Sequence, residues 1–85
     1  MPLIPSNEEP EVGDIYFWKS DIEKDQKHGR DPQTHFRIIL SKNERNGSFV
    51  VYRNVPSIMN KIDNISIVGL SHSIRDGYIK LYKIK

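Results

Sequence analysis

Apolar and polar side chains alternate along short stretches of this chain, which predicts β-strands rather than long helices. In the first stretch, a period of two puts Ile15 and Phe17 on one face and Tyr16 and Trp18 on the other. One of these pairs should belong to the core, and the other should be half exposed. The five predicted strands span residues 14–19, 35–42, 49–54, 65–70 and 78–84.

Turn-forming residues separate the predicted strands. Asn46-Gly47 suits positive backbone φ and predicts a hairpin between the second and third strands. Asp76-Gly77 predicts a turn before the last strand, and residues 71–74 predict a connector or a single 3₁₀ turn. Residues 56–64 leave two interpretations open, namely one short helix or a loop with buried isoleucine anchors.

A long polar stretch, residues 20–34, follows the first predicted strand. Ile22 is its only aliphatic residue. We expect a long first loop, with at most one helical turn near residues 21–25, that ends before Pro32.

The chain of 85 residues is long enough for one small domain. Three prolines in residues 1–11 predict a flexible or extended arm, and residues 12–85 form the predicted domain. Alanine is absent and isoleucine is frequent, which favours an all-β fold. We expect a five-stranded antiparallel sheet that closes into a small barrel, because closure removes unpaired edges. An unpaired last strand would allow a homodimer by edge-strand pairing.

Two segments carry a resemblance to known proteins. Val12-Gly13-Asp14-Ile15-Tyr16-Phe17, followed by Phe36-Arg37-Ile38-Ile39-Leu40-Ser41, resembles the pattern of small SH3-like barrels, and residues 51–55 resemble the central strand of small phage and bacterial barrels. The opening also resembles PemK/MazF-type endoribonuclease toxins, although Ile38 rather than proline follows Arg37 and the chain is short for that family. The resemblance implies an SH3-like barrel with a long first loop, encoded by a phage or mobile element and acting in the host cytoplasm.

Charge is distributed unevenly along the chain. The net charge is +2, but residues 1–34 carry eight acids and four bases, whereas residues 35–85 carry three acids and nine bases. A basic second half attracts phosphate or an acidic protein face, unless the two halves pack together and partly cancel. The longest apolar run, residues 15–18, is too short to span a membrane, and the start of the chain has no targeting pattern, so we expect a cytoplasmic protein.

Candidate catalytic and cofactor residues are few. There is no cysteine, and the spacing of His28, His35 and His72 does not match a zinc site, so we expect neither a metal nor a cofactor. The chain has no nucleophile elbow and no glycine-rich phosphate loop. Ribonuclease chemistry by Arg30 or Arg37 with Thr34 stays open as an alternative.

Aromatic residues interleave with basic ones, which is typical of binding surfaces. Such residues dominate protein interfaces and also stack on the bases of single-stranded nucleic acid, although they can equally cap a small core. Our leading hypothesis is a non-catalytic module that binds a host protein, with RNA or DNA binding or a PemK/MazF-like endoribonuclease as alternatives. The predicted partner-binding residues are Tyr16, Trp18, Arg30, Arg37, Tyr52, Arg53, Lys80 and Tyr82.

Overall fold

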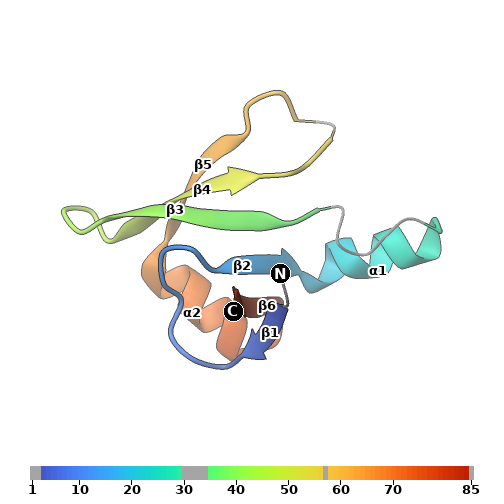
Figure 1. Ribbon diagram of the computed structural model, residues 1–85, viewed down its shortest axis with the longest axis horizontal. Helices are drawn as coiled ribbons and strands as arrows, with labels where there is room; N and C mark the ends of the chain where they lie inside the picture. Colours follow the sequence, from blue (N-terminus) through green and yellow to red (C-terminus); the bar gives the residue numbers. More distant parts are fainter. Residues whose placement is uncertain (1–2, 30–34, 57, 85) are drawn as a thin grey trace.

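The computed structural model describes residues 3–29, 35–56 and 58–84, which form six strands and two helices (Figure 1). The strands are β1 (Leu3–Ser6), β2 (Ile15–Trp18), β3 (Arg37–Asn43), β4 (Ser48–Arg53), β5 (Ile62–Ser66) and β6 (Ile79–Ile84). The helices are α1 (Lys19–Lys27) and α2 (Ile67–Arg75).

All six strands belong to one antiparallel sheet in the order β1-β6-β2-β3-β4-β5. The sheet is open, so the described strands β1 and β5 are its two edges. The all-β prediction is confirmed, but the expected five-stranded closed barrel is not what the structure shows. The physical reason lies at the end of β5. Helix α2 begins there at once and covers the core, so the chain adds no further strand at that point.

The hairpin of β3 and β4 confirms the prediction made from Asn46-Gly47. Gly47 has a φ of +64°, the left-handed conformation that this turn requires. The register pairs Arg37 with Arg53 and Asn43 with Ser48, and it shifts by one residue between Ile39 and Ser41. This bulge bends the strand and strengthens the local twist of the sheet.

The hydrophobic core lies on one face of the sheet, which we call the inner face. Tyr16 is 1% exposed and belongs to this core, and Trp18 packs against it. The Tyr16 and Trp18 pair is therefore the core pair of the first strand, although Phe17 on the other face is also buried. The other fully packed members of the core cluster are Ile39, Phe49, Val51, Leu70, Ile79 and Leu81.

Helix α2 corrects two predictions, because residues 65–70 are not one strand and residues 71–74 are not a 3₁₀ turn. The Ser66 hydroxyl accepts a hydrogen bond from the Gly69 N–H and caps the helix start. Leu70 is fully buried, so one face of α2 packs on the inner face of the sheet. Gly77, at a φ of +86°, ends the helix, so the predicted Asp76-Gly77 turn is a helix C-terminus.

Helix α1 corrects the prediction of a long first loop. It spans nine residues, follows β2 without a break, and takes up the first half of the polar stretch (Figure 1). Gly29, at a φ of +72°, lies just beyond its end. Residues 30–34 of the predicted loop lie outside the described residues.

The first and last strands also differ in part from expectation. Residues 3–6 of the expected arm form β1, which pairs with β6. Strand β6 therefore lies between β1 and β2 rather than at an edge, so it is not the strand that offers edge pairing. The described part of residues 56–64 contains no helix, and β5 begins there at Ile62.

Candidate functional site

A continuous row of apolar and aromatic residues crosses the face of the sheet opposite the core. Directly opposed residues in an antiparallel sheet point to the same face, so the register identifies the members of this row. We call it the outer row, and from β1 to β5 it consists of Pro5, Tyr82, Ile15, Ile38, Tyr52 and Ile62.

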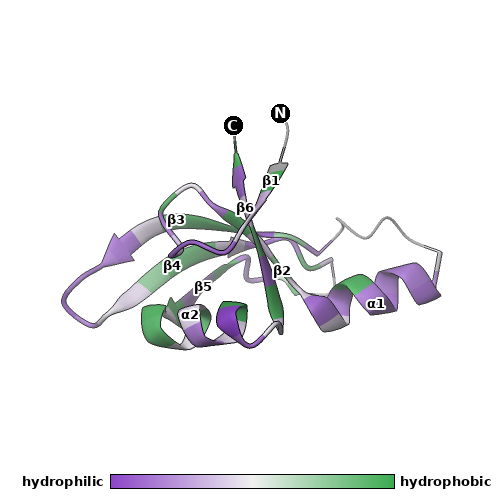
Figure 2. Cartoon of the chain, turned by 90° about the horizontal axis from the view of Figure 1, so that it is seen from below, coloured by the Kyte–Doolittle hydropathy of each residue, from purple (hydrophilic) through white to green (hydrophobic). Residues whose placement is uncertain are grey.

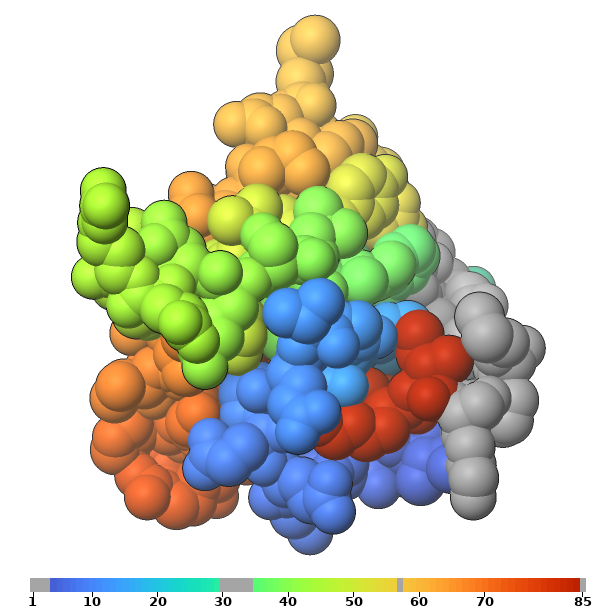
Figure 3. Space-filling view, turned by 60° about the vertical axis from the view of Figure 1, so that its left-hand side comes forward, coloured from blue at the N-terminus to red at the C-terminus, as the bar shows by residue number. Residues whose placement is uncertain are grey.

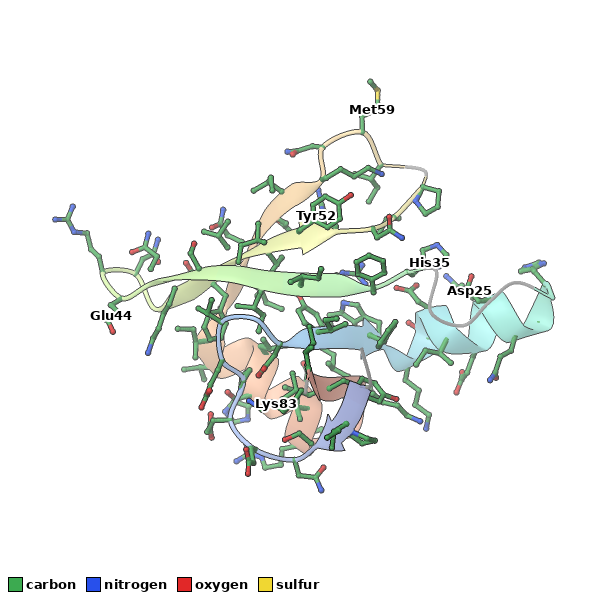
Figure 4. All side chains as sticks on the ribbon, in the orientation of Figure 1. Asp25, His35, Glu44, Tyr52, Met59 and Lys83 are labelled. Atoms are coloured by element: carbon green, nitrogen blue, oxygen red, sulfur yellow. The ribbon has the colours of Figure 1, made fainter. Side chains whose placement is uncertain are left out.

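The outer row is apolar and open to solvent along much of its length. Ile62 is 46% exposed, and Tyr82, Ile15, Ile38 and Tyr52 are half-buried. Figure 4 shows the Tyr52 ring on the opposite side of β4 from α2. Exposed groups of large apolar side chains on one surface mark interaction sites more often than single ones do.

Two contacts between aromatic rings fix the orientation of side chains on this face. The rings of Phe36 and Tyr52 lie 6.5 Å apart, and the rings of Phe17 and Tyr82 meet edge to face at 5.5 Å. Both tyrosines of the outer row are therefore fixed by a neighbouring ring. Such preorganised side chains lose little freedom when a partner binds.

Both helices contact the sheet through residues of the inner face. Leu70 of α2 joins the core cluster of Tyr16 and Val51, and Asp21 of α1 contacts Arg37, which is paired with Tyr16 across the strands. Figure 2 shows both helices on the same side of β3, β4 and β5. Among the described elements, no helix covers the outer row.

The inner face ends in a polar cluster that brings two predicted site residues together. Arg37 and Arg53 lie directly opposite each other on β3 and β4, an arrangement that is destabilising unless nearby acids compensate it. Arg37 Nη1 lies 3.2 Å from Asp21 Oδ2, and Arg53 Nη1 lies 3.4 Å from Asp63 Oδ2. Each guanidinium therefore has its own carboxylate.

Tyr16 lies beside this arginine pair and is strongly perturbed by its surroundings. Burial raises the pKa of Tyr16 from 10.0 to about 12, and Asp63 raises this pKa as well, whereas Arg37 and Arg53 oppose the shift. The hydroxyl group therefore stays protonated at neutral pH and is no ready base or nucleophile.

Two matched polar contacts position α1 against the extension of β3. Asp25 Oδ2 lies 2.7 Å from His35 Nδ1, and Asp25 itself is fully buried. Asp21 and Asp25 are four residues apart and therefore lie on the same side of α1. Their partners are Arg37 at the start of β3 and His35 just before it, so both contacts hold the polar helix against the start of this strand.

The predicted partner-binding residues fall on two different faces. Tyr16 is in the core and offers no surface, Trp18 is half-buried on the inner face, and Arg37 and Arg53 form the pair described above.

Three of the remaining predicted residues lie on the outer face. Tyr52 and Tyr82 belong to the outer row, and Lys80 is exposed opposite Phe17. Arg30 lies outside the described residues. Ile38 and Ile62 were not predicted as surface residues, because alternation alone does not say which face of a strand is covered.

Comparisons with known proteins found no matching family model, no related curated protein and no similar solved structure. In the part of the chain that the structure describes, no helix is long and apolar enough to cross a membrane. Within the same residues, no group of three or more His, Cys, Asp and Glu side chains is placed to hold a metal ion.

Proposed function

We propose that this chain is a small non-catalytic interaction module that binds a protein through its outer row. The observation that supports this proposal is the row itself, which crosses six strands and lies on the face that neither described helix covers. Its two tyrosines are the residue type enriched at protein interfaces, and its isoleucines supply apolar area beside them.

Nucleic-acid binding is the second candidate, and the opposed pair of Arg37 and Arg53 is the observation that favours it. Nucleic-acid binding would place Arg37, Arg53, Lys80 and Lys83 on phosphates. Three of these four cations already meet a carboxylate, because Lys83 Nζ also lies 2.6 Å from Asp14 Oδ2. A phosphate must compete with these carboxylates, so we favour a protein partner. The endoribonuclease alternative uses Arg30 or Arg37 with Thr34. Arg30 and Thr34 lie outside the described residues, and Arg37 contacts Asp21.

We also infer that the sheet is an opened relative of the SH3-like barrel. The order of features supports this inference, because β2 follows Val12-Gly13-Asp14, a long connection comes next, and the β3–β4 hairpin follows. On the same resemblance, the proposed partner is a host protein in the cytoplasm of a cell that carries a phage or mobile element.

Comparative capture tests the outer row. The wild-type chain and two variants are immobilised, exposed to host lysate and analysed by quantitative mass spectrometry. Tyr52→Ser removes a tyrosine of the row, and Tyr78→Ser removes one that is 64% exposed but lies outside it. We expect one protein to bind the wild type and Tyr78→Ser but to be lost from Tyr52→Ser, with an affinity loss of about 30-fold for the purified pair.

Three outcomes would contradict the proposal. These are a captured protein that both variants retain equally, a partner that disappears after nuclease treatment, and a lysate from which nothing binds the wild type above background.

A further inference from the structure

Strand β5 presents unpaired backbone groups at one edge of the sheet. The Arg53 N–H donates to the Lys61 carbonyl at 2.6 Å, and the Ile67 N–H donates to the Gly47 carbonyl at 2.9 Å. These bonds show that the odd-numbered residues of this segment face β4, so the backbone groups of even-numbered residues point away from it. The central one is Asn64, whose N–H and C=O both point outward at the edge.

The groups on either side of Asn64 are less available. The side-chain oxygen of Asn60 already accepts a hydrogen bond from the Ile62 N–H at 3.1 Å. The Ser66 side chain caps α2. An added strand would therefore be centred on Asn64.

The other edge of the sheet is a poorer template for an added strand. Strand β1 has only four residues, and Pro5 within it has no N–H to donate. Strand β5 contains no proline and is exposed along most of its length. Pairing at an edge is therefore expected at β5.

We propose that a second copy of this chain pairs with β5 in the antiparallel direction, about a two-fold axis at Asn64. Asn64 then exchanges two N–H···O bonds with the partner's Asn64, and the interface is self-complementary. Asp63 comes opposite the partner's Ile65, so no like charges meet. The Asp63 carboxylate also keeps its own contact with Arg53.

Exposed apolar residues on both sides of β5 favour a second copy over an unrelated strand. Met59 is 98% exposed and precedes Asn64 by five residues, and Val68 is 65% exposed and follows it by four. In an antiparallel pair, the end of β5 that follows Met59 lies beside the end of the partner's β5 that precedes Val68, so these apolar residues come to the same end of the interface. Figure 3 shows the light-orange segment before β5 standing out from the body of the molecule, where a second copy can reach it.

Self-association of the full chain tests this inference without any target protein, so its outcome is independent of the proposed function. Sedimentation of the wild type from about 10 µM to about 1 mM covers the range in which small interfaces form. We expect the average mass to rise from that of one chain towards that of two.

Asn64→Pro removes the outward N–H and no hydrogen bond to β4, and prolines are tolerated at such edge positions. We expect this variant to stay monomeric throughout. Asn64→Thr keeps the N–H and suits a strand, so we expect it to associate like the wild type. Met59→Lys should weaken association by about tenfold, because it removes the apolar contact at both ends.

Hydrogen exchange of the wild type is the second measurement, and it does not depend on whether Asn64→Pro folds. The Asn64 amide should exchange quickly in dilute solution and become protected as concentration rises. Four results would overturn the inference: a wild type that stays monomeric, a folded Asn64→Pro variant that associates normally, an Asn64 amide with no concentration-dependent protection, or a foreign peptide that pairs with β5 while the wild type alone does not associate.

Discussion

The two faces of the sheet use similar residue types in opposite ways. On the inner face, Tyr16 and Val51 are each 1% exposed and pack against Leu70 of α2. On the outer face, Tyr52 lies on β4, the strand that also carries Val51, and Ile62 lies on the neighbouring β5. Both side chains remain partly open to solvent. The difference arises from the position of the helices, both of which contact inner-face residues. A strand sequence rich in aromatic and branched residues can therefore supply a core on one side and a binding surface on the other.

The largest expected difference between the faces is in stability. Leu70→Ala removes a fully buried side chain of α2 that packs on the inner face, and it should lower the free energy of unfolding by about 2–5 kcal/mol. Ile62→Ala on the outer row should lower it by about 0.5 kcal/mol. Urea unfolding measures both changes, and equal losses would contradict the assignment of the two faces.

Alkaline pH should lower the free energy of unfolding through the ionisation of Tyr16 on the inner face. Its pKa rises from 10.0 to about 12 on folding, so the neutral hydroxyl is favoured in the folded state. This stabilisation is fully present below pH 10 and is lost as pH rises through about 12, by roughly 3 kcal/mol in total. Urea unfolding at several pH values should show this loss in the wild type and a smaller loss in Tyr16→Phe. Identical pH profiles for the two proteins would show that Tyr16 is not buried as described.

The carboxylates beside the arginine pair should contribute less. Asp21→Asn leaves Arg37 facing Arg53 with one compensating acid removed, and we expect a loss of about 1 kcal/mol that shrinks as salt is added. Glu44, in the hairpin turn, is a matched control because its contact with Lys42 at 3.9 Å is exposed (Figure 4). Glu44→Gln should have almost no effect, and an equally small effect of Asp21→Asn would remove the argument for compensation.

The smallest expected effect is the binding of RNA or DNA. Since Arg37, Arg53 and Lys83 already contact carboxylates, fluorescence anisotropy at low salt should show only weak binding of RNA or DNA, with a dissociation constant near 10⁻⁴ M. Micromolar binding that weakens steeply with salt and is lost in Arg53→Ala would favour the second candidate instead.

Strands β2, β3, β4 and β6 and the hairpin could be predicted from the sequence, whereas β1 and the bounds of β5 could not, and the helices were missed for two different reasons. In α2, Ile67, Leu70 and Ile74 have helical spacing, and the β-branched residues around them also suit a strand. The serine cap at Ser66 and Gly77 beyond the end were the signals that distinguish the two.

Helix α1 gave almost no apolar signal. Ile22 is its only aliphatic residue, and polar contacts from Asp21 and Asp25 hold it in place. Their partners, His35 and Arg37, lie ten and sixteen residues further along the chain, so helical periodicity could not reveal them. Gly29 beyond the helix end was the local sign that could have been used.

The candidate site could be predicted only in part, because a strand pattern identifies two faces without saying which one is covered. Tyr52 and Tyr82 were predicted as partner-binding residues and lie in the outer row, whereas Tyr16, predicted on the same chemistry, lies in the core. The register across all six strands was needed to align Ile15, Ile38 and the tyrosines into one row.

Thiol labelling of two adjacent positions tests this division of the sheet most directly. The chain has no cysteine, so Val51→Cys and Tyr52→Cys each introduce a single thiol on β4, one on each face. We predict that Tyr52→Cys is labelled within about tenfold of the rate in urea, and that Val51→Cys is labelled at least about a hundredfold more slowly until the protein unfolds. Similar labelling rates at the two positions in the folded protein would contradict the account.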